Sequence, residues 1–159
     1  MTVNWPTRPK LLRPFTGPVT IKFGDETAET VHTGAILDTG TSLITLPGDY
    51  AEMINTMMGA QKSWTGQYAV DCDKVARLPD ITFKLDGTDF SLPLSDYIVE
   101  VQGTCMSVIA ALDVPEPIGP VVTLGDVLLR SYYSIFDLGK GRVGLAMRTS
   151  DLTSVLGGI

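Results

Sequence analysis

Turn residues interrupt this chain so often that only short elements fit between them. Gly-Pro, Pro-Gly and Asp-Gly pairs occur at Gly17-Pro18, Pro47-Gly48 and Asp86-Gly87. Nine runs of four or five residues between such turns are rich in β-branched, aromatic and other apolar side chains: Val19–Phe23, Ala35–Asp38, Leu43–Leu46, Ile81–Leu85, Tyr97–Val101, Met106–Ala110, Val121–Leu124, Tyr133–Phe136 and Val143–Ala146. Many short strands separated by turns are typical of all-β domains, so we expect an all-β fold made mainly of antiparallel strands.

Two helices are expected among these strands. Asp49 and Glu52 have the spacing of a capping box, in which each side chain bonds a free backbone N–H at the start of a helix. Apolar residues then recur at helical spacing until Gly59, a residue that favours the end of a helix. A second, shorter helix is expected to start with Asp126 as its N-cap and to run to about Tyr132.

The length and charge of the chain exclude several classes of protein. Its 159 residues fit one domain with a sizeable core. Twelve basic residues against eighteen acidic ones give a net charge of −6. Nucleic acids and anionic membranes are bound by clustered Lys and Arg, so we expect neither as a partner. The longest apolar runs have the length of a strand, so no membrane span is expected.

Three segments of the chain differ in character. Residues 1–18 contain a proline-rich, basic stretch, "WPTRPKLLRPFTGP", which we interpret as an arm or linker that lies against a partner surface. Prolines lack the N–H that a strand ladder needs, which disfavours regular strand pairing in this arm. Residues 19–147 contain the expected strands and helices, and residues 148–159 form a tail.

An acidic residue lies between two apolar runs in the stretch "AILDTGTSLITLP". Burying a carboxylate is costly unless hydrogen-bond donors surround it, so the position of Asp38 suggests chemistry. Gly40 allows a tight turn. Donors for the carboxylate are available on the three hydroxyl residues of the turn, Thr39, Thr41 and Ser42. From these residues alone, an ordinary turn in which Asp38 bonds nearby backbone N–H groups is the alternative.

Other residues that could carry chemistry are few. Cys72 and Cys105 are too few and too far apart for a cysteine-based metal site, and they form either one disulfide or two unrelated buried thiols. His32 is the single histidine, so no Ser-His or Cys-His nucleophilic pair is convincing. We therefore expect no metal and no cofactor. Trp64 is expected to be a packing anchor.

The Asp38 turn and several stretches beyond it resemble one protein family. These stretches include "DTGTSLITLP", "LPDITF", "PEPIGP" and "LGDVLLRSYYSIFDLGKGRVGLA". From about Lys22 to Ala146 the chain resembles the carboxyl-terminal lobe of pepsin-like aspartic proteases, and most of all their vacuolar and lysosomal members. The resemblance implies a single lobe of that fold, with antiparallel sheets, a ψ-shaped loop and two short helices. The arm then falls where the family places strands that join its two lobes.

The resemblance also implies a role for each matched residue. Asp38 would be one of two catalytic carboxylates, which share a proton and activate a water for peptide-bond hydrolysis at acid pH. Residues that would support this catalytic loop are Thr39, Gly40, Thr41, Ser42 and Gly125. Ile36 and Thr123 would line substrate subsites, and Cys72 would pair with Cys105. The family's chemistry uses no metal and no cofactor.

The sequence contains one Asp-Thr-Gly turn, whereas a pepsin-like enzyme uses two such turns. One hypothesis is that the chain works beside an N-terminal protease lobe. A second is a homodimer in which two copies of Asp38 meet across a two-fold axis. A third is a non-catalytic domain that binds peptides or another protein. We expect an isolated monomer to be inactive, the completed enzyme to act on peptides or proteins, and its location to be vacuolar or lysosomal, with secretion as the alternative.

Overall fold

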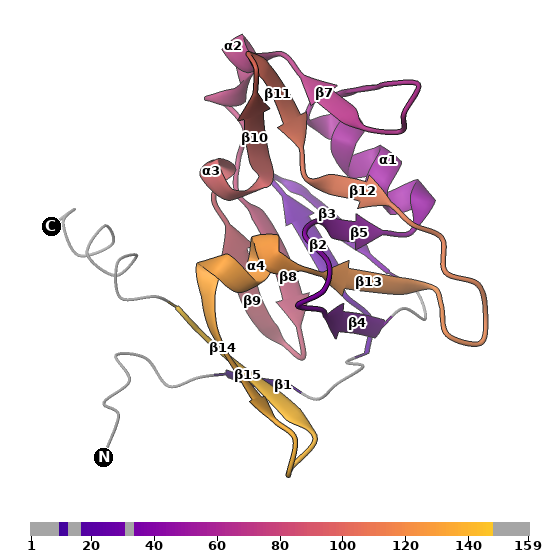
Figure 1. The fold of residues 1–159 in the computed structure, drawn as a ribbon, viewed down its shortest axis with the longest axis vertical. Helices are drawn as coiled ribbons and strands as arrows, with labels where there is room; N and C mark the ends of the chain where they lie inside the picture. Colours follow the sequence, from indigo (N-terminus) through magenta and orange to yellow (C-terminus); the bar gives the residue numbers. More distant parts are fainter. Residues whose placement is uncertain (1–9, 13–16, 31–33, 148–159) are drawn as a thin grey trace, which may run out of the picture.

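The computed structural model describes residues 10–12, 17–30 and 34–147 (Figure 1). The strands are β1 (Lys10–Leu12), β2 (Thr20–Phe23), β3 (Glu26–Glu29), β4 (Gly34–Leu37), β5 (Ile44–Leu46), β6 (Gln61–Lys62), β7 (Tyr68–Val70), β8 (Ile81–Leu85), β9 (Thr88–Leu92), β10 (Ile98–Val101), β11 (Thr104–Ser107), β12 (Ile109–Ala111), β13 (Val121–Leu124), β14 (Tyr132–Asp137) and β15 (Arg142–Met147). The helices in these ranges are α1 (Gly48–Met57), α2 (Cys72–Val75), α3 (Leu94–Tyr97) and α4 (Asp126–Ser131). The expected all-β fold is confirmed, and α2 and α3 are present in addition to the two helices that were expected.

A mixed sheet in the middle of the molecule places the Asp38 turn. Its strand order is β12-β5-β13-β4. Strand β13 is parallel to β4 and antiparallel to β5, and β12 is parallel to β5. All four residues of β13 are buried, as expected for a strand with a neighbour on each edge and a continuous apolar sequence. The expected antiparallel pairing therefore holds in the other three sheets of the described residues but only partly in this one.

A second sheet, with strand order β3-β2-β8-β9, carries much of the core. In β8 the side chains alternate between the core and the outer face, as the period of a strand requires. Ile81, Phe83 and Leu85 of this strand are each at most 1% exposed. Burial of side chains of this size stabilises a fold by roughly 1.5–3 kcal/mol each.

The third sheet, with order β10-β11-β7-β6, contains the disulfide. Cys105 in β11 is bonded to Cys72, the first residue of α2, with their Cα atoms 5.3 Å apart. This confirms the pairing that the resemblance implied. The cross-link ties β11 to the helix that follows β7. In the chain-entropy model, closing a loop of this size stabilises by about 3–4 kcal/mol.

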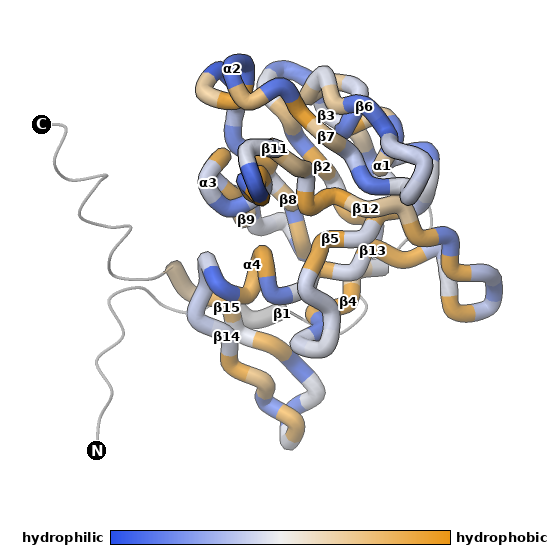
Figure 2. Tube along the Cα trace, turned by 45° about the horizontal axis from the view of Figure 1, so that its top comes forward, coloured by the Kyte–Doolittle hydropathy of each residue, from blue (hydrophilic) through white to orange (hydrophobic). Residues whose placement is uncertain are grey.

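The fourth sheet, with order β1-β15-β14, lies at the opposite end of the molecule from β10 and β11 (Figure 1). Lys10–Leu12 pairs antiparallel with β15, so these residues of the arm do pair regularly, although its prolines disfavour such pairing. The reason is local, because Pro9 and Pro14 lie outside the three paired residues. Figure 2 shows hydrophobic positions continuing along the projecting hairpin of β14 and β15.

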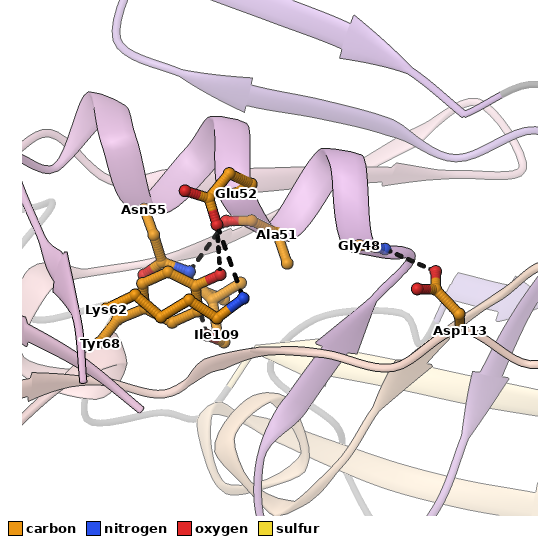
Figure 3. A network of polar contacts seen from close by, with 8 residues as sticks. All are labelled: Gly48, Ala51, Glu52, Asn55, Lys62, Tyr68, Ile109 and Asp113. Atoms are coloured by element: carbon orange, nitrogen blue, oxygen red, sulfur yellow. Dashed lines mark hydrogen bonds and ion pairs between the residues drawn. The ribbon is translucent and has the colours of Figure 1, made fainter. Parts of the chain in front are cut away.

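The helix starts differ from those expected. Helix α1 begins after Pro47 and has no side-chain cap of its own, and Gly48 N–H donates instead to Asp113 Oδ1 at 2.8 Å (Figure 3). A carboxylate at this position also favours the positive end of the helix dipole. The expected capping box is therefore wrong, whereas the helix does end before Gly59, which has a φ of +71°. In α4 the N-cap is Gly125 and not Asp126.

Two further expectations need correction, and three fall wholly or mostly outside the described residues. Met106–Ala110 is not one strand, because it is divided between β11 and β12 in two different sheets. Trp64 is not a packing anchor, since it is 97% exposed. His32, the tail at residues 148–159 and most of the arm lie outside the described residues. Within the described ranges, no helix has the length and apolar character needed to cross a membrane.

Candidate active site

The Asp38 turn crosses the end of a buried strand. Strands β4 and β5 lie on the two sides of β13, so the turn that joins them passes over the end of β13. Asp38 N–H donates at 3.1 Å to the carbonyl oxygen of Leu124, which is the last residue of β13. The turn is thereby fixed to the middle of the sheet rather than to a free edge.

Gly125 follows β13 and lies directly under the turn. Its N–H donates to Leu43 O at 3.2 Å, and the next N–H, that of Asp126, donates to Thr41 O at 2.8 Å. A Cβ atom on Gly125 would lie 2.1 Å from Thr41 O and 2.4 Å from Leu43 O. The turn and the start of α4 can approach this closely only because residue 125 has no side chain.

The carboxylate of Asp38 accepts two hydrogen bonds from its own turn. Gly40 N–H donates to Oδ1 at 2.9 Å, and the Thr41 hydroxyl donates to Oδ2 at 2.6 Å. Asp38 is half-buried, and Thr39 and Gly40 are exposed. The carboxylate therefore does not occupy the interior, although the strand that follows it, β5, is fully buried. It is a surface group whose orientation is set by neighbouring donors.

These donors also set the protonation of the site. The Thr41 hydroxyl, followed by the Gly40 N–H, lowers the pKa of Asp38 below its ordinary value of 3.8, against a smaller opposing effect of burial. Hydrogen bonds to a charged carboxylate favour the charged form. Asp38 in this chain is therefore ionised at all but strongly acidic pH and can accept a proton from water.

Replacing Thr41 by Val is expected to raise the pKa of Asp38 toward 3.8, because the Thr41 hydroxyl, the donor that lowers this pKa most, is lost. A lowered carboxyl pKa contributes stability that is present above the unfolded-state pKa and is lost as pH falls through the folded-state pKa. The T41V variant should therefore lose less stability than the wild type as pH falls below about 3.8. The measurement is an NMR titration of the Asp38 carboxyl carbon, with Thr82→Val as a control hydroxyl deletion on another sheet. Identical Asp38 titrations in T41V and wild type would contradict this account.

The remaining residues expected at the site lie at different depths. Thr39 and Ser42 are exposed on the turn. Ile36 in β4 is half-buried and is the register partner of Thr123 in β13. Thr123 is buried within the sheet, at 7% exposure. The structure thus groups the expected residues around the end of β13, and their assigned roles stay predictions.

A pocket of about 460 Å³ has Leu43, which follows the turn, among its lining residues. Its lining is mainly apolar and includes Tyr68 of β7, Val99 and Val101 of β10, and Met106 of β11. No local sequence motif marks these residues as part of a site. Their strands are separated in the chain, so only the sheet order brings them together.

The described residues include no group of three or more His, Cys, Asp or Glu side chains that could hold a metal ion. What the site offers is a single carboxylate, held ionised at an accessible turn, beside an apolar pocket. One carboxylate can act as a base toward water. It cannot also supply the acid that a two-carboxylate mechanism requires.

Comparison with known proteins gives a consistent result. The family model described as "Eukaryotic aspartyl protease" matches residues 18–148. A probable vacuolar protease A of Arthroderma benhamiae is 58% identical over 126 residues, which is 79% of this chain and 32% of that protein. A vacuolar aspartic protease of Candida albicans is 56% identical over 79% of this chain and 30% of its own length, and mouse gastricsin is 47% identical over 70% of this chain and 29% of its own length. The chain spans about a third of the length of the relatives it matches.

Proposed function

The chain belongs to the eukaryotic aspartyl protease family, and on this premise we propose that it is the carboxyl-terminal lobe of an aspartic endopeptidase. Asp38 supplies one of the two catalytic carboxylates. The observation that carries the proposal is the Asp38 carboxylate itself, which Gly40 and Thr41 hold ionised and accessible at the end of β4.

The chemistry requires a second carboxylate beside Asp38. Two carboxylates in contact cannot both ionise, so they hold one proton between them and titrate as a pair. The ionised member takes a proton from water as the water attacks the peptide carbonyl, and the protonated member polarises that carbonyl. The described residues that hydrogen-bond to Asp38 include no other acid, and in this proposal the second carboxylate comes from a partner lobe.

The hairpin of β14 and β15 offers a surface for such a partner. Large apolar side chains are exposed on this hairpin or at its tip: Tyr133, Phe136, Leu138 and Met147. Leu138 is 91% exposed. Exposed apolar side chains gathered on one element mark a contact surface more often than a solvent-facing one. An amino-terminal lobe that packs here would extend the sheet β1-β15-β14.

The substrate is an extended peptide with apolar side chains. The pocket reaches the end of the catalytic turn through Leu43 and is lined mainly by apolar residues. A site of this kind takes apolar side chains by removing them from water, and backbone groups at its rim orient the chain. One lobe provides half of the groove, and the partner lobe provides the rest.

The enzyme works in the vacuole. The relatives from Arthroderma benhamiae and Candida albicans are named as vacuolar proteases. The disulfide between Cys72 and Cys105 is consistent with passage through an oxidising compartment. A fluorescently tagged full-length protein that failed to overlap a vacuolar stain would argue against this location.

The proposal is tested by complementation. The chain alone should not cleave a fluorogenic peptide at acid pH, because it has half a dyad. Mixed with the part of the Arthroderma benhamiae protease that it does not match, it should form a one-to-one complex by size exclusion and cleave the peptide. If the chain alone is active and its activity rises with the square of its concentration, the second carboxylate comes from a second copy of the chain and not from a partner lobe. A folded one-to-one complex that binds the peptide and never cleaves it would overturn the enzymatic proposal in favour of a binding domain.

A further inference from the structure

The side chain of Glu52 in helix α1 contacts Tyr68, a residue that lines the apolar pocket. Glu52 Oε2 accepts a hydrogen bond from the Tyr68 hydroxyl at 2.7 Å (Figure 3). Lys62 Nζ lies 3.9 Å from the same carboxylate oxygen and 5.5 Å from the centre of the Tyr68 ring. Two charged groups of opposite sign therefore hold one aromatic side chain at its hydroxyl and over its face.

Tyr68 is nearly buried, at 2% exposure, and it lines the pocket. Burial first, and then the hydrogen bond to Glu52, raise the pKa of its hydroxyl, so the hydroxyl remains a donor across the pH range of the proposed enzyme. Because the ring is fixed at its outer end, its position does not depend on packing alone. Loss of the contact with Glu52 would allow the ring to move.

The same helix also supports a neighbouring part of the pocket. Asn55 is fully buried, and its Nδ2 donates to Ala51 O within the helix and to Ile109 O in β12 (Figure 3). Ile109 is another lining residue. Helix α1 thus holds two strands that line the pocket, one by a side-chain contact and the other by a backbone carbonyl.

We propose that Glu52 and Lys62 are positioning residues that fix the Tyr68 ring and so determine which peptide side chain the pocket accepts. The accepted side chain is bulky and apolar, because the other walls include Leu43, Val101 and Met106. The pair does not contact the reacting atoms. This inference rests on the proposed function, since it treats the pocket as part of the substrate groove.

The test uses the complemented enzyme and peptides in which leucine is replaced by alanine at one position at a time. Among the positions that do not flank the cleaved bond, the one at which alanine lowers kcat/KM most identifies the side chain that enters the pocket. At that position, Glu52→Ala and Tyr68→Phe should each reduce the preference for leucine about tenfold, the lower end of what a lost hydrogen bond to a charged group costs. Glu52→Gln, which keeps an acceptor, should retain most of the preference. Tyr132→Phe, which removes a hydroxyl bonded to Ser91 O elsewhere, is the matched control.

A purely structural role predicts a different pattern. In that case Glu52→Ala would lower kcat/KM equally for leucine and alanine peptides and for a short peptide that does not reach the pocket, and the inference would be overturned. If the assembly cleaves nothing, the failure belongs to the proposed function, and the inference is tested on the chain alone. A leucine peptide should then shift the NMR signal of a labelled Tyr68 ring in the wild type and in E52Q, and much less in E52A. Equal shifts in all three, or none in any, would also overturn it.

Discussion

Replacing Asp38 by Asn in the complemented enzyme is expected to lower kcat for peptide hydrolysis by about 10⁴-fold, the upper range for loss of a general acid–base group. Asn has nearly the shape of Asp, so the turn should survive. Its oxygen can still accept from Gly40 N–H or from the Thr41 hydroxyl. What it cannot do is ionise, and the pair can then no longer share a proton. KM for peptides should change little, because the groove is unaltered.

The control for this variant is Asp71→Asn. Asp71 is an exposed carboxylate that, like Asp38, accepts a backbone N–H; its donor is Asp73 at the start of α2, outside the Asp38 turn. D71N removes the same charge and should leave kcat unchanged within a factor of about two, as expected for a neutral surface substitution. Complex formation is measured for each variant by size exclusion. A D38N complex that forms normally and retains more than a tenth of the wild-type kcat would show that Asp38 is not catalytic.

Replacing Gly125 by Ala is expected to destabilise the chain by about 3 kcal/mol or more, at the upper end for overpacking. The backbone of Gly125, with φ −90° and ψ −156°, lies in a region that alanine can adopt, so the cost is steric and not conformational. The new Cβ would lie 2.1 Å from Thr41 O and 2.4 Å from Leu43 O. Both are backbone carbonyls in the loop that also carries Asp38, so they can move away only if the turn moves with them. The complemented enzyme should therefore lose activity even at temperatures at which the variant stays folded.

Gly139→Ala is the matched control, because its nearest contact for a new Cβ is Asp137 Oδ1 at 3.7 Å. We expect this variant to change stability by less than about 0.5 kcal/mol. Urea unfolding of both variants at neutral pH measures the difference. A G125A variant with wild-type stability would mean that the turn over β13 can shift at little cost, and the account of a rigid catalytic turn would then fail.

The strands that the sequence analysis found are those with continuous or alternating apolar residues. Val121–Leu124 and Ile81–Leu85 were predicted with their observed bounds, because each is an uninterrupted β-prone run between turns. Strands β3 and β9 were missed, since "ETAE" and "TDFSL" are largely polar. Strand β3 is held by pairing with β2, whereas β9 pairs with β8 and also buries Phe90 and Leu92 in the core. The presence of β3 is therefore a tertiary property, while the alternation of Phe90 and Leu92 in β9 is a local signal that was overlooked.

Helix capping shows the same division. The end of α1 at Gly59 depends on a local conformation that glycine favours, and it was predicted. The start of α1 was not, because its cap is the carboxylate of Asp113, which comes from a loop beyond β12. The spacing of Asp49 and Glu52 indicated a local cap, but Glu52 bonds Tyr68 instead. A local sequence pattern cannot reveal that a side chain distant in the sequence caps the helix.

The sequence by itself determined the Asp38 turn, since its donors, Gly40 and Thr41, lie two and three residues from the carboxylate they bond. Contacts between residues so close in the sequence form wherever the chain turns, and the residue types decide which hydrogen bonds are made. Only the tertiary structure decided what lies beneath and beside the turn. Gly125 supports it from the end of β13, and Tyr68, held by Glu52, lines the pocket to which Leu43 also contributes. These groups meet because sheet pairing and burial bring remote strands together. The free energy of pairing and burial belongs to the whole fold and not to any one stretch of residues.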